Sequence, residues 1–208
     1  MLIIFDFDGV LRSASWQGLF EAYIALVEYK EKDHKEFFGN LEEFKNWFNS
    51  DWRENLRRIG EFNRKEYLVT DKIFHSHYDP HIMIFPWVKA LLEDLSKRHA
   101  LALLSASSIK SIEKSLDNLS GFFSVIMGSE HVGEIKPDPE GVHLILEKLN
   151  GTPGDTLIVG DTEADILAGQ AAGIKTGAVK WGGITPWETL MDLKPDYAFH
   201  EPDELFSL

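Results

Sequence analysis

The sequence predicts an α/β fold, in which a parallel sheet is covered by helices on both faces and interrupted once by a helical insert. Short apolar runs, each followed by turn residues and then by a helical pattern, recur along most of the chain. Such runs are typical of strands buried on both faces of a parallel sheet, and their alternation with helices favours crossover connections. A long segment without such a run separates the first strand from the second. We therefore expect a Rossmann-like, three-layer α/β/α domain with an inserted helical cap domain.

The expected elements follow one another in a regular order. The strands are expected at 2–5, 101–104, 125–127, 157–159 and 175–179. Helices are expected at 87–98, 142–149 and 165–172, where apolar residues recur at helical spacing. Gly173 ends the last of these helices just before the next strand.

Residues 13–84 differ in composition, being aromatic and charged, and contain no convincing buried strand. One helical stripe comprises Phe44, Trp47, Phe48 and Trp52, and is continued by Leu56 and Ile59. A second stripe comprises Leu19, Ala22, Tyr23 and Leu26. The expected domains are therefore an α/β core domain over 1–12 and 85–208 and a helical cap domain over 13–84.

The composition limits the possible partners and the compartment. The chain has 208 residues, a formal net charge of −13 and no cysteine. An acidic surface repels nucleic-acid backbones and anionic lipid, and the lack of cysteine excludes disulfides and thiolate-bound metals. The first residues carry carboxylates where a signal peptide needs an apolar run, and no stretch is long and apolar enough to span a membrane. We expect a cytoplasmic protein without nucleic-acid or membrane partners, either a monomer or a homodimer.

Carboxylates follow two of the expected strands. Asp6 and Asp8 come directly after the first strand, and Asp161 and Asp165 after the fourth. The carboxyl ends of parallel strands meet at one edge of the sheet, where ligands bind, and an oxygen-rich cluster is the ligand set that Mg²⁺ prefers. Each pair also has an ordinary structural interpretation. Asp6 to Gly9 is compatible with a solvated turn, and Asp161 or Thr162 with a helix cap.

Two weaker features complete the pattern. Ser105 and Ala106 follow the second strand before a helical run, and backbone N–H groups at such a helix start can bind phosphate. Lys136 precedes Pro137, which disfavours a helical conformation at the lysine. Alone, the serine is compatible with a simple helix cap and the lysine with a surface charge.

These four features, in this order, resemble the haloacid dehalogenase superfamily, especially its phosphoglycolate-phosphatase-like branch with a helical cap after the first strand. The resemblance covers nearly all of residues 1–12 and 85–208. The matching segments are Asp6-Phe-Asp8-Gly-Val, Ser105, Lys136-Pro-Asp, Gly160-Asp161-Thr-Glu-Ala-Asp165, Val179-Lys-Trp-Gly-Gly and Pro195-Asp-Tyr-Ala.

The resemblance implies a role for each matched residue. Asp6 would be the nucleophile and a Mg²⁺ ligand, and Asp8 would protonate the leaving alkoxide, later activate water, and bind the metal through its backbone carbonyl. Asp161 would be a metal ligand, and Asp165 would hold a metal-bound water or orient Lys136. Lys136 would neutralise charge on Asp6 and the phosphoryl group. Ser105 and the N–H of Ala106 would bind phosphoryl oxygens, although many relatives carry a polar side chain at the second position.

The implied function is Mg²⁺-dependent hydrolysis of a small phosphomonoester, such as phosphoglycolate, a sugar phosphate or a nucleotide, through an aspartyl-phosphate. Asp8 argues against a dehalogenase, because those relatives lack a second aspartate in this motif. A phosphomutase remains the alternative within the superfamily, and a non-catalytic binding protein the alternative outside catalysis. Closure of the cap would exclude water and help to read the substrate.

Charged residues in and near the insert leave further alternatives open. A second anionic group of the substrate could be bound by Arg12, the arginine nearest to Asp6 and Asp8 in the sequence. Weaker candidates are Arg53, Arg57, Arg58 and Arg64. For each of them, a solvated helix charge is the commoner state of an arginine. His75, His77 and His81 could suggest a transition-metal site. Their irregular spacing and the lack of cysteine favour surface or partly buried histidines instead.

Overall fold

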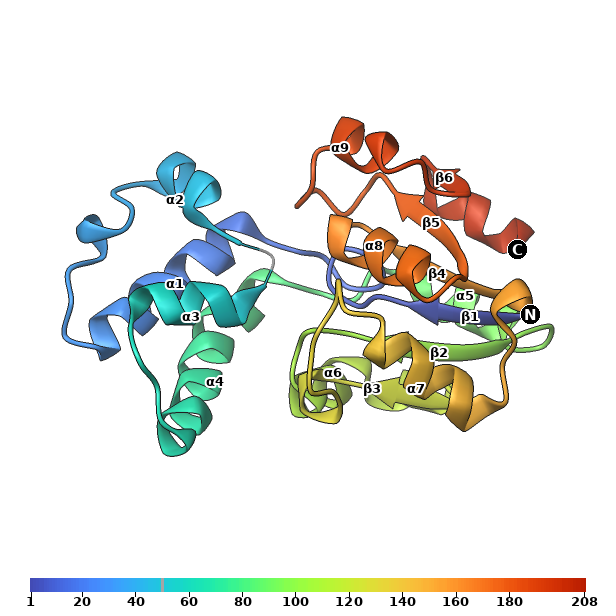
Figure 1. Ribbon diagram of the computed structural model, residues 1–208, viewed down its shortest axis with the longest axis horizontal. Coiled ribbons are helices and arrows are strands. Elements are labelled where there is room, and N and C mark those ends of the chain that lie inside the picture. The colour runs from blue at the N-terminus through green and yellow to red at the C-terminus, as the bar shows by residue number, and fades with distance from the viewer. Residues whose placement is uncertain (50) are drawn as a thin grey trace. The chain divides into compact units, whose positions relative to one another are not determined.

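The computed structural model describes residues 1–49 and 51–208, apart from the side chains of residues 64 and 65, and divides into two compact units (Figure 1). The first unit, here called the α/β unit, comprises Met1–Ala14 and Ile84–Leu208. The second, here called the helical insert, comprises Ser15–Met83. The prediction that the insert acts as a cap stays a prediction.

The α/β unit contains one parallel sheet with the strand order β3-β2-β1-β4-β5-β6. The strands are β1 (Leu2–Phe5), β2 (Ala100–Leu104), β3 (Val125–Met127), β4 (Thr156–Gly160), β5 (Lys175–Val179) and β6 (Tyr197–Phe199). The chain builds outward from β1 to β3 on one side and then returns to place β4 on the other side of β1. The order of the strands therefore reverses beside β1, and ligands of such sheets bind at the carboxyl ends of the strands at this point.

Successive residues of β1 point to opposite faces of the sheet, as the pleat requires. Ile3 and Phe5 belong to one buried cluster, together with apolar residues of α5 (Val88–Leu95) and α6 (Ile109–Leu116). Leu2 and Ile4 belong to another, together with residues of α7 (Glu140–Leu149) and α8 (Glu163–Ala171). Helices thus cover both faces, as Figure 1 shows, and the predicted three-layer α/β fold is confirmed.

Two parts of this unit lie outside the predicted elements. Strand β6 pairs with β5, with Gly177 opposite Tyr197 and Val179 opposite Phe199. The sequence does not predict this strand, because a run of three residues is too short to show a period. Helix α9 (Trp187–Asp192) is also short, and only Leu190 of it is buried. The predicted helix at 87–98 is shorter in the structure, ending at Leu95.

The helical insert contains α1 (Trp16–Tyr29), α2 (Leu41–Trp47), α3 (Trp52–Ile59) and α4 (Arg64–Tyr78). The stripe predicted in α1 is buried at all four positions. The fully buried ring of Phe44 is the centre of an aromatic cluster. The rings whose centroids lie 4.9 to 6.3 Å from that of Phe44 are Trp16, Phe20, Tyr23, Phe38, Trp47 and Phe48.

The prediction of one helical stripe from Phe44 to Ile59 is wrong, because the helix ends after α2 and a new helix begins at α3. Phe48 is already extended, with φ −64° and ψ 138°. The side chain of Asp51 then caps α3 by accepting from Arg53 N, and Asn49 N donates to Asn55 Oδ1. Short polar side chains offer the backbone these local bonds in place of helical ones.

Two arginines of the insert pair with an acid on their own helix. Arg57 and Arg58 pair with Glu54 at 3.2 and 3.5 Å, as exposed helix charges do. The side chain of Arg64 lies outside the described residues. None of the helices in the described part of the chain has the length and apolar character needed to cross a membrane.

Candidate active site

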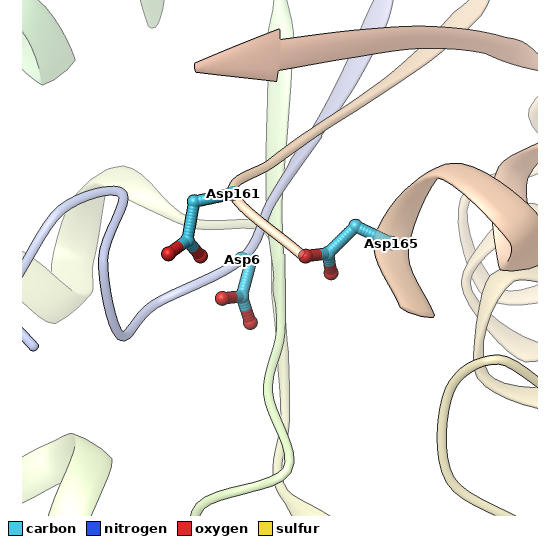
Figure 2. Close-up of side chains that lie close together, drawn as sticks. All are labelled: Asp6, Asp161 and Asp165. Carbon is cyan, nitrogen blue, oxygen red and sulfur yellow. The ribbon is translucent and has the colours of Figure 1, made fainter. Parts of the chain in front are cut away.

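Strands β1 and β4 bring two aspartates to the same edge of the sheet. Residues Leu2–Phe5 pair in parallel with Thr156–Val159, and Asp6 N continues the ladder by donating to Val159 O at 2.9 Å. Asp6 and Asp161 therefore follow neighbouring strands, with Asp6 level with Gly160, and Figure 2 shows the two carboxylates close together. Both side chains are buried.

Lys136 lies between Asp6 and Asp165 and binds both. Its Nζ donates to Asp6 Oδ1 at 2.7 Å, to Asp165 Oδ1 at 2.5 Å and to the carbonyl oxygen of Leu104 at 3.0 Å. The three donors of the ammonium group thus have three acceptors. The lysine is buried, so the simple interpretation as a surface charge does not apply.

Asp165 both caps its helix and binds the lysine. Its Oδ2 accepts from Thr162 N at 3.1 Å and Thr162 Oγ1 at 2.6 Å, where Thr162 is the N-cap residue of α8. Its Oδ1 accepts from Lys136. Both oxygens of this fully buried carboxylate are therefore already bonded, which supports the orienting role among the two that the resemblance implies for Asp165.

Asp161 contrasts with Asp165, because neither of its buried carboxylate oxygens has a hydrogen-bond partner among the described residues. Backbone approaches it closely from two sides. A Cβ at Gly9 or at Gly182 would lie 2.1 Å from Asp161 Oδ2, so both positions require glycine. Gly9 also has a φ of +82°, a conformation that side chains disfavour. A buried and unpaired carboxylate is costly unless a cation binds it.

The residues of this edge fit a divalent cation. One carboxylate oxygen from each of Asp6, Asp161 and Asp165 lies within 4.8 Å of the others, the only such group of three or more potential ligands among the described residues. Oxygen ligands of this kind suit Mg²⁺. The unpartnered oxygens of Asp161 are the observation that favours a cation most directly.

The electrostatics of the site reflect the crowding of these acids. Burial, and to a smaller extent repulsion by Asp165 and Asp8, raises the pKa of Asp6 to about 7 against the opposing effect of Lys136. Burial together with the charges of Asp6 and Asp165 raises the pKa of Asp161 well above its usual range. Burial alone would lower the pKa of Lys136, but attraction by Asp165 and Asp6 outweighs it and raises that pKa. A cation would lower the repulsion among the acids.

Asp8 and Arg12 form an ion pair within the α/β unit. Arg12 Nη2 lies 2.6 Å and Nε 2.9 Å from Asp8 Oδ1, and Ser107 Oγ donates to Asp8 Oδ2 at 2.7 Å. Arg12 is predicted above as a candidate for substrate binding. In the structure it is 1% exposed and its guanidinium is occupied by partners in the chain itself.

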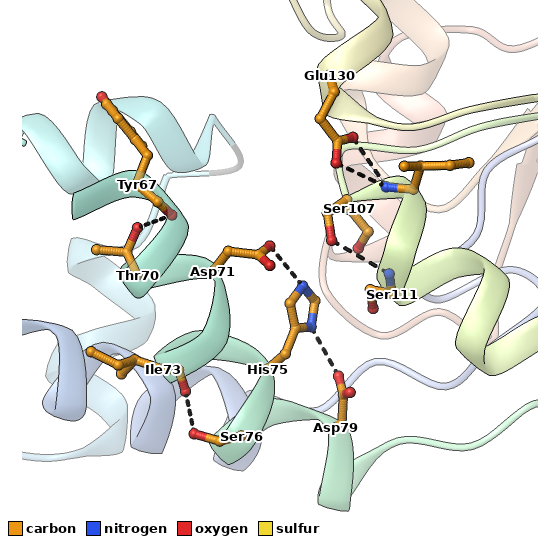
Figure 3. Close-up of polar contacts among 12 residues, drawn as sticks. Tyr67, Thr70, Asp71, Ile73, His75, Ser76, Asp79, Ser107, Ser111 and Glu130 are labelled. Carbon is orange, nitrogen blue, oxygen red and sulfur yellow. Dashed lines mark hydrogen bonds and ion pairs between the residues drawn. The ribbon is translucent and has the colours of Figure 1, made fainter. Parts of the chain in front are cut away.

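The segment of Ser105 and Ala106 differs in detail from the expected helix start. Ser105 is buried, and its hydroxyl accepts from Ser107 N at 3.0 Å. Helix α6 begins only at Ile109, whose N–H donates to the carboxylate of Glu130 at 3.0 Å (Figure 3). The first N–H of this helix is therefore already engaged. Ser105 and Ala106 instead line a small pocket together with Leu104 and Lys136.

The three histidines of the insert have separate environments (Figure 3 shows His75). His75 lies between Asp79, 2.9 Å from Nδ1, and Asp71, 3.4 Å from Nε2. His81 Nε2 lies 2.8 Å from Glu21, and His77 Nδ1 lies 2.9 Å from Ile73 O. No group of three potential metal ligands includes any of them among the described residues.

Two features of the site could not be assigned from the sequence. Gly182 is part of the segment quoted for the resemblance, but its contact with Asp161 depends on the fold. The available signal for Arg12 was a stripe of hydroxyls at i, i+4 and i+8. It comprises Ser107, just before α6, and Ser111 and Ser115 within it. All three bind Arg12 in the structure.

At one edge of a parallel α/β sheet, three buried carboxylates thus lie close together, and a buried lysine binds two of them. This is the kind of place where α/β proteins bind ligands and carry out reactions. A family model described as haloacid dehalogenase-like hydrolase matches residues 3–179. The chain belongs to this family, and the resemblance stated from the motifs is confirmed. It is an enzyme of the phosphatase class, so the non-catalytic alternative is set aside.

Named relatives agree with this assignment. The chain is similar to a phosphoglycolate phosphatase of Aquifex aeolicus, at 34% identity over 100% of this chain and 95% of the relative. It is also similar to the pyrophosphatase PpaX of Oceanobacillus iheyensis, at 29% identity over 99% and 95%. A solved structure of a haloacid dehalogenase-like family protein from Streptococcus pneumoniae has the same fold, with a TM-score of 0.76, 23% identity, and coverage of 99% and 96%.

Proposed function

We propose that this chain is a Mg²⁺-dependent phosphatase that hydrolyses a small phosphomonoester through an aspartyl-phosphate formed on Asp6. The observation that carries the proposal is the pair of neighbouring carboxylates at the ends of β1 and β4. One of them is bonded to a buried lysine, and the other is buried without a partner among the described residues. This arrangement combines a candidate nucleophile with a place for a cation.

Asp6 and Asp161 would hold the cation, with the backbone carbonyl of Asp8 and with Asp165 close by. When bound, Mg²⁺ supplies charge stabilisation for the phosphoryl oxygens during their displacement. The two oxygens of Asp165 already have partners, so its main contribution is to hold Lys136 in place.

Asp6 attacks the phosphorus atom, and the bond from phosphorus to the ester oxygen breaks as the new bond forms. Lys136 Nζ, 2.7 Å from Asp6 Oδ1, offsets the repulsion between the carboxylate and the anionic phosphoryl group. The hydroxyl of Ser105 accepts from Ser107 N, so its own proton can be donated to a phosphoryl oxygen. A covalent intermediate divides one difficult displacement into two easier ones.

Asp8 transfers the protons. In the first step it donates a proton to the leaving oxygen, and in the second it takes a proton from the water that attacks phosphorus, which releases Asp6 and phosphate. The guanidinium of Arg12 lies beside this carboxylate, with Nη2 2.6 Å from Asp8 Oδ1.

The names of the relatives give two substrates to compare. A phosphoglycolate phosphatase cleaves a monoester, whereas a pyrophosphatase cleaves an anhydride. Asp8 is required more strongly for the monoester, because an alkoxide needs a proton to leave and a phosphate does not. We therefore place phosphomonoesters first, with phosphoglycolate as the first member to test.

The experiment is phosphate release from phosphoglycolate, pyrophosphate, sugar phosphates, nucleotides and para-nitrophenyl phosphate, with Mg²⁺ and with EDTA. We expect Mg²⁺-dependent release that is fastest with one monoester. Fastest release from pyrophosphate would replace the monoester assignment, and no release by a folded protein that binds Mg²⁺ would favour a phosphomutase.

A further inference from the structure

Arg12 is the largest fully buried side chain of the described residues, and every nitrogen of its guanidinium has a partner. Nε and Nη2 bind Asp8 Oδ1 at 2.9 and 2.6 Å. Nη2 also donates to Ser107 Oγ at 3.3 Å, and Nη1 donates to Ser111 Oγ at 3.3 Å and Ser115 Oγ at 2.9 Å. These contacts tie Asp8 to three hydroxyls of the segment that contains α6.

The backbone between Phe7 and Arg12 fixes the place from which Arg12 reaches Asp8. Arg12 N donates to Phe7 O at 2.9 Å, and Gly9 N donates to Arg12 O at 2.7 Å, which closes the chain into a tight turn. The guanidinium carbon lies 4.4 Å from the centre of the Phe7 ring. A buried arginine is rare. The cost of transferring its charge from water to the protein interior is offset only when its donors are bonded and its charge is paired.

Both oxygens of the Asp8 carboxylate are oriented by this network. Arg12 holds Oδ1, and Ser107 donates to Oδ2 at 2.7 Å while accepting from Arg12. A guanidinium has only donors, so the oxygen that it holds can only accept. The Ser107 hydroxyl can reverse its role, since a hydroxyl both donates and accepts. Oδ2 is therefore the oxygen able to carry a proton to and from a substrate.

We propose that Arg12 is a positioning residue, which together with Ser107 fixes the orientation of the Asp8 carboxylate for proton transfer. The inference rests on the proposed phosphatase function and differs from a substrate-binding role, because the donors of Arg12 are occupied within the chain. It also differs from a purely structural anchor, which would hold the turn to α6 without affecting proton transfer.

Leaving groups separate a positioning role from a structural one. An alkyl phosphate requires protonation of its leaving oxygen, whereas para-nitrophenolate leaves without a proton. The test is single-turnover cleavage of an alkyl phosphate and of para-nitrophenyl phosphate by the wild type, Arg12→Lys and Ser107→Ala. Arg12→Lys keeps the charge but loses the two-pronged contact with Asp8. Ser107→Ala removes only one half-buried hydroxyl of the same network. If Arg12→Lys does not fold, this variant alone tests the positioning role.

We expect Arg12→Lys to lower the rate of alkyl phosphate cleavage by ~10- to 100-fold with little change in KM, and Ser107→Ala to lower it by ~10-fold. The release of para-nitrophenolate should fall by less than ~3-fold in both. Ser120→Ala, which removes a hydroxyl that donates only to Asp117 O, serves as the matched control and should behave as the wild type with both substrates.

Equal losses with the two substrates, or no loss with either, in Ser107→Ala and in a folded Arg12→Lys protein would overturn the positioning role and leave the phosphatase function standing. A wild-type protein that cleaves neither substrate would overturn the proposed function, and the positioning role with it.

Discussion

In the α/β unit, three carboxylates and a lysine are buried together at the strand ends, whereas the helical insert buries aromatic rings around Phe44. The insert also buries polar groups, but Asn55 is bonded to Tyr23 Oη and to the backbone of residue 49. Asp161, in contrast, is buried without a partner among the described residues. Packed rings and paired amides stabilise a fold. A buried, unpaired carboxylate destabilises it, and such groups concentrate where a ligand or a reaction requires them.

The largest expected effect is the loss of turnover in Asp6→Asn. The substitution keeps the size of the side chain but removes the nucleophile, so turnover should fall at least ~10⁴-fold, equivalent to about 5.5 kcal/mol of activation free energy. Phosphate release measures the loss, and circular dichroism should show an unchanged fold. Turnover like that of the wild type would show that Asp6 is not the nucleophile.

Loss of the central ring of the insert should lower the stability of the protein. Phe44→Ala removes a fully buried ring, and the free energy of unfolding should fall by about 3–5 kcal/mol. The matched control is Leu68→Ala in α4, at a side chain that is 70% exposed, which should change it by less than about 0.5 kcal/mol. Denaturant unfolding compares the two, and similar values for both variants would mean that the aromatic cluster does not stabilise the insert.

A substitution at Asp161 is expected to raise the stability of the metal-free protein instead of lowering it. Asp161→Asn replaces a buried, unpartnered charge by a neutral group, so the metal-free protein should become more stable by about 1–3 kcal/mol at neutral pH. Thermal melting with Mg²⁺ and with EDTA is the measurement. The wild type should gain stability from Mg²⁺, because a ligand that binds only the folded state stabilises it, and the variant should not. An equal gain in both proteins would place the cation elsewhere.

The smallest effect concerns His75 in the insert. Burial lowers its pKa, but the hydrogen bonds with Asp71 and Asp79 outweigh burial and raise it above the usual value. The pairing should therefore stabilise the protein fully below about pH 6.5, and this contribution should be lost as the pH rises through the folded-state pKa. His75→Asn should lower the free energy of unfolding by less than about 1 kcal/mol, and by more at about pH 5.5 than at about pH 9. Denaturant unfolding at the two pH values measures the difference. A difference that grows with pH would contradict the raised pKa.

The sequence predicted the parallel sheet well, because each buried strand is a separate apolar run. It also singled out Asp6, Lys136 and Asp161, which the structure brings together, while their roles in catalysis and metal binding stay predictions. Strand β6 was missed because three residues show no period. The break between α2 and α3 was missed because it depends on local bonds of Asn49 and Asp51 that periodicity does not report.

Contacts between distant segments account for the rest of the site. Arg12 meets Ser107 and Ser115 only because β1 and β2 are neighbours in the sheet. The same holds for Gly182, whose approach to Asp161 follows from the position of β5 beside β4. Short motifs identify residues able to react, but the residues that position them are found only when the strand order is known.

The central claim is that Asp6 becomes phosphorylated during turnover. The most direct measurement is peptide mass spectrometry of the protein after rapid acid quenching of a reaction with substrate and Mg²⁺. We predict one phosphoryl group on the peptide that contains Asp6 in the wild type and none in Asp6→Asn. A phosphoryl group on another residue, or turnover by Asp6→Asn, would contradict the account.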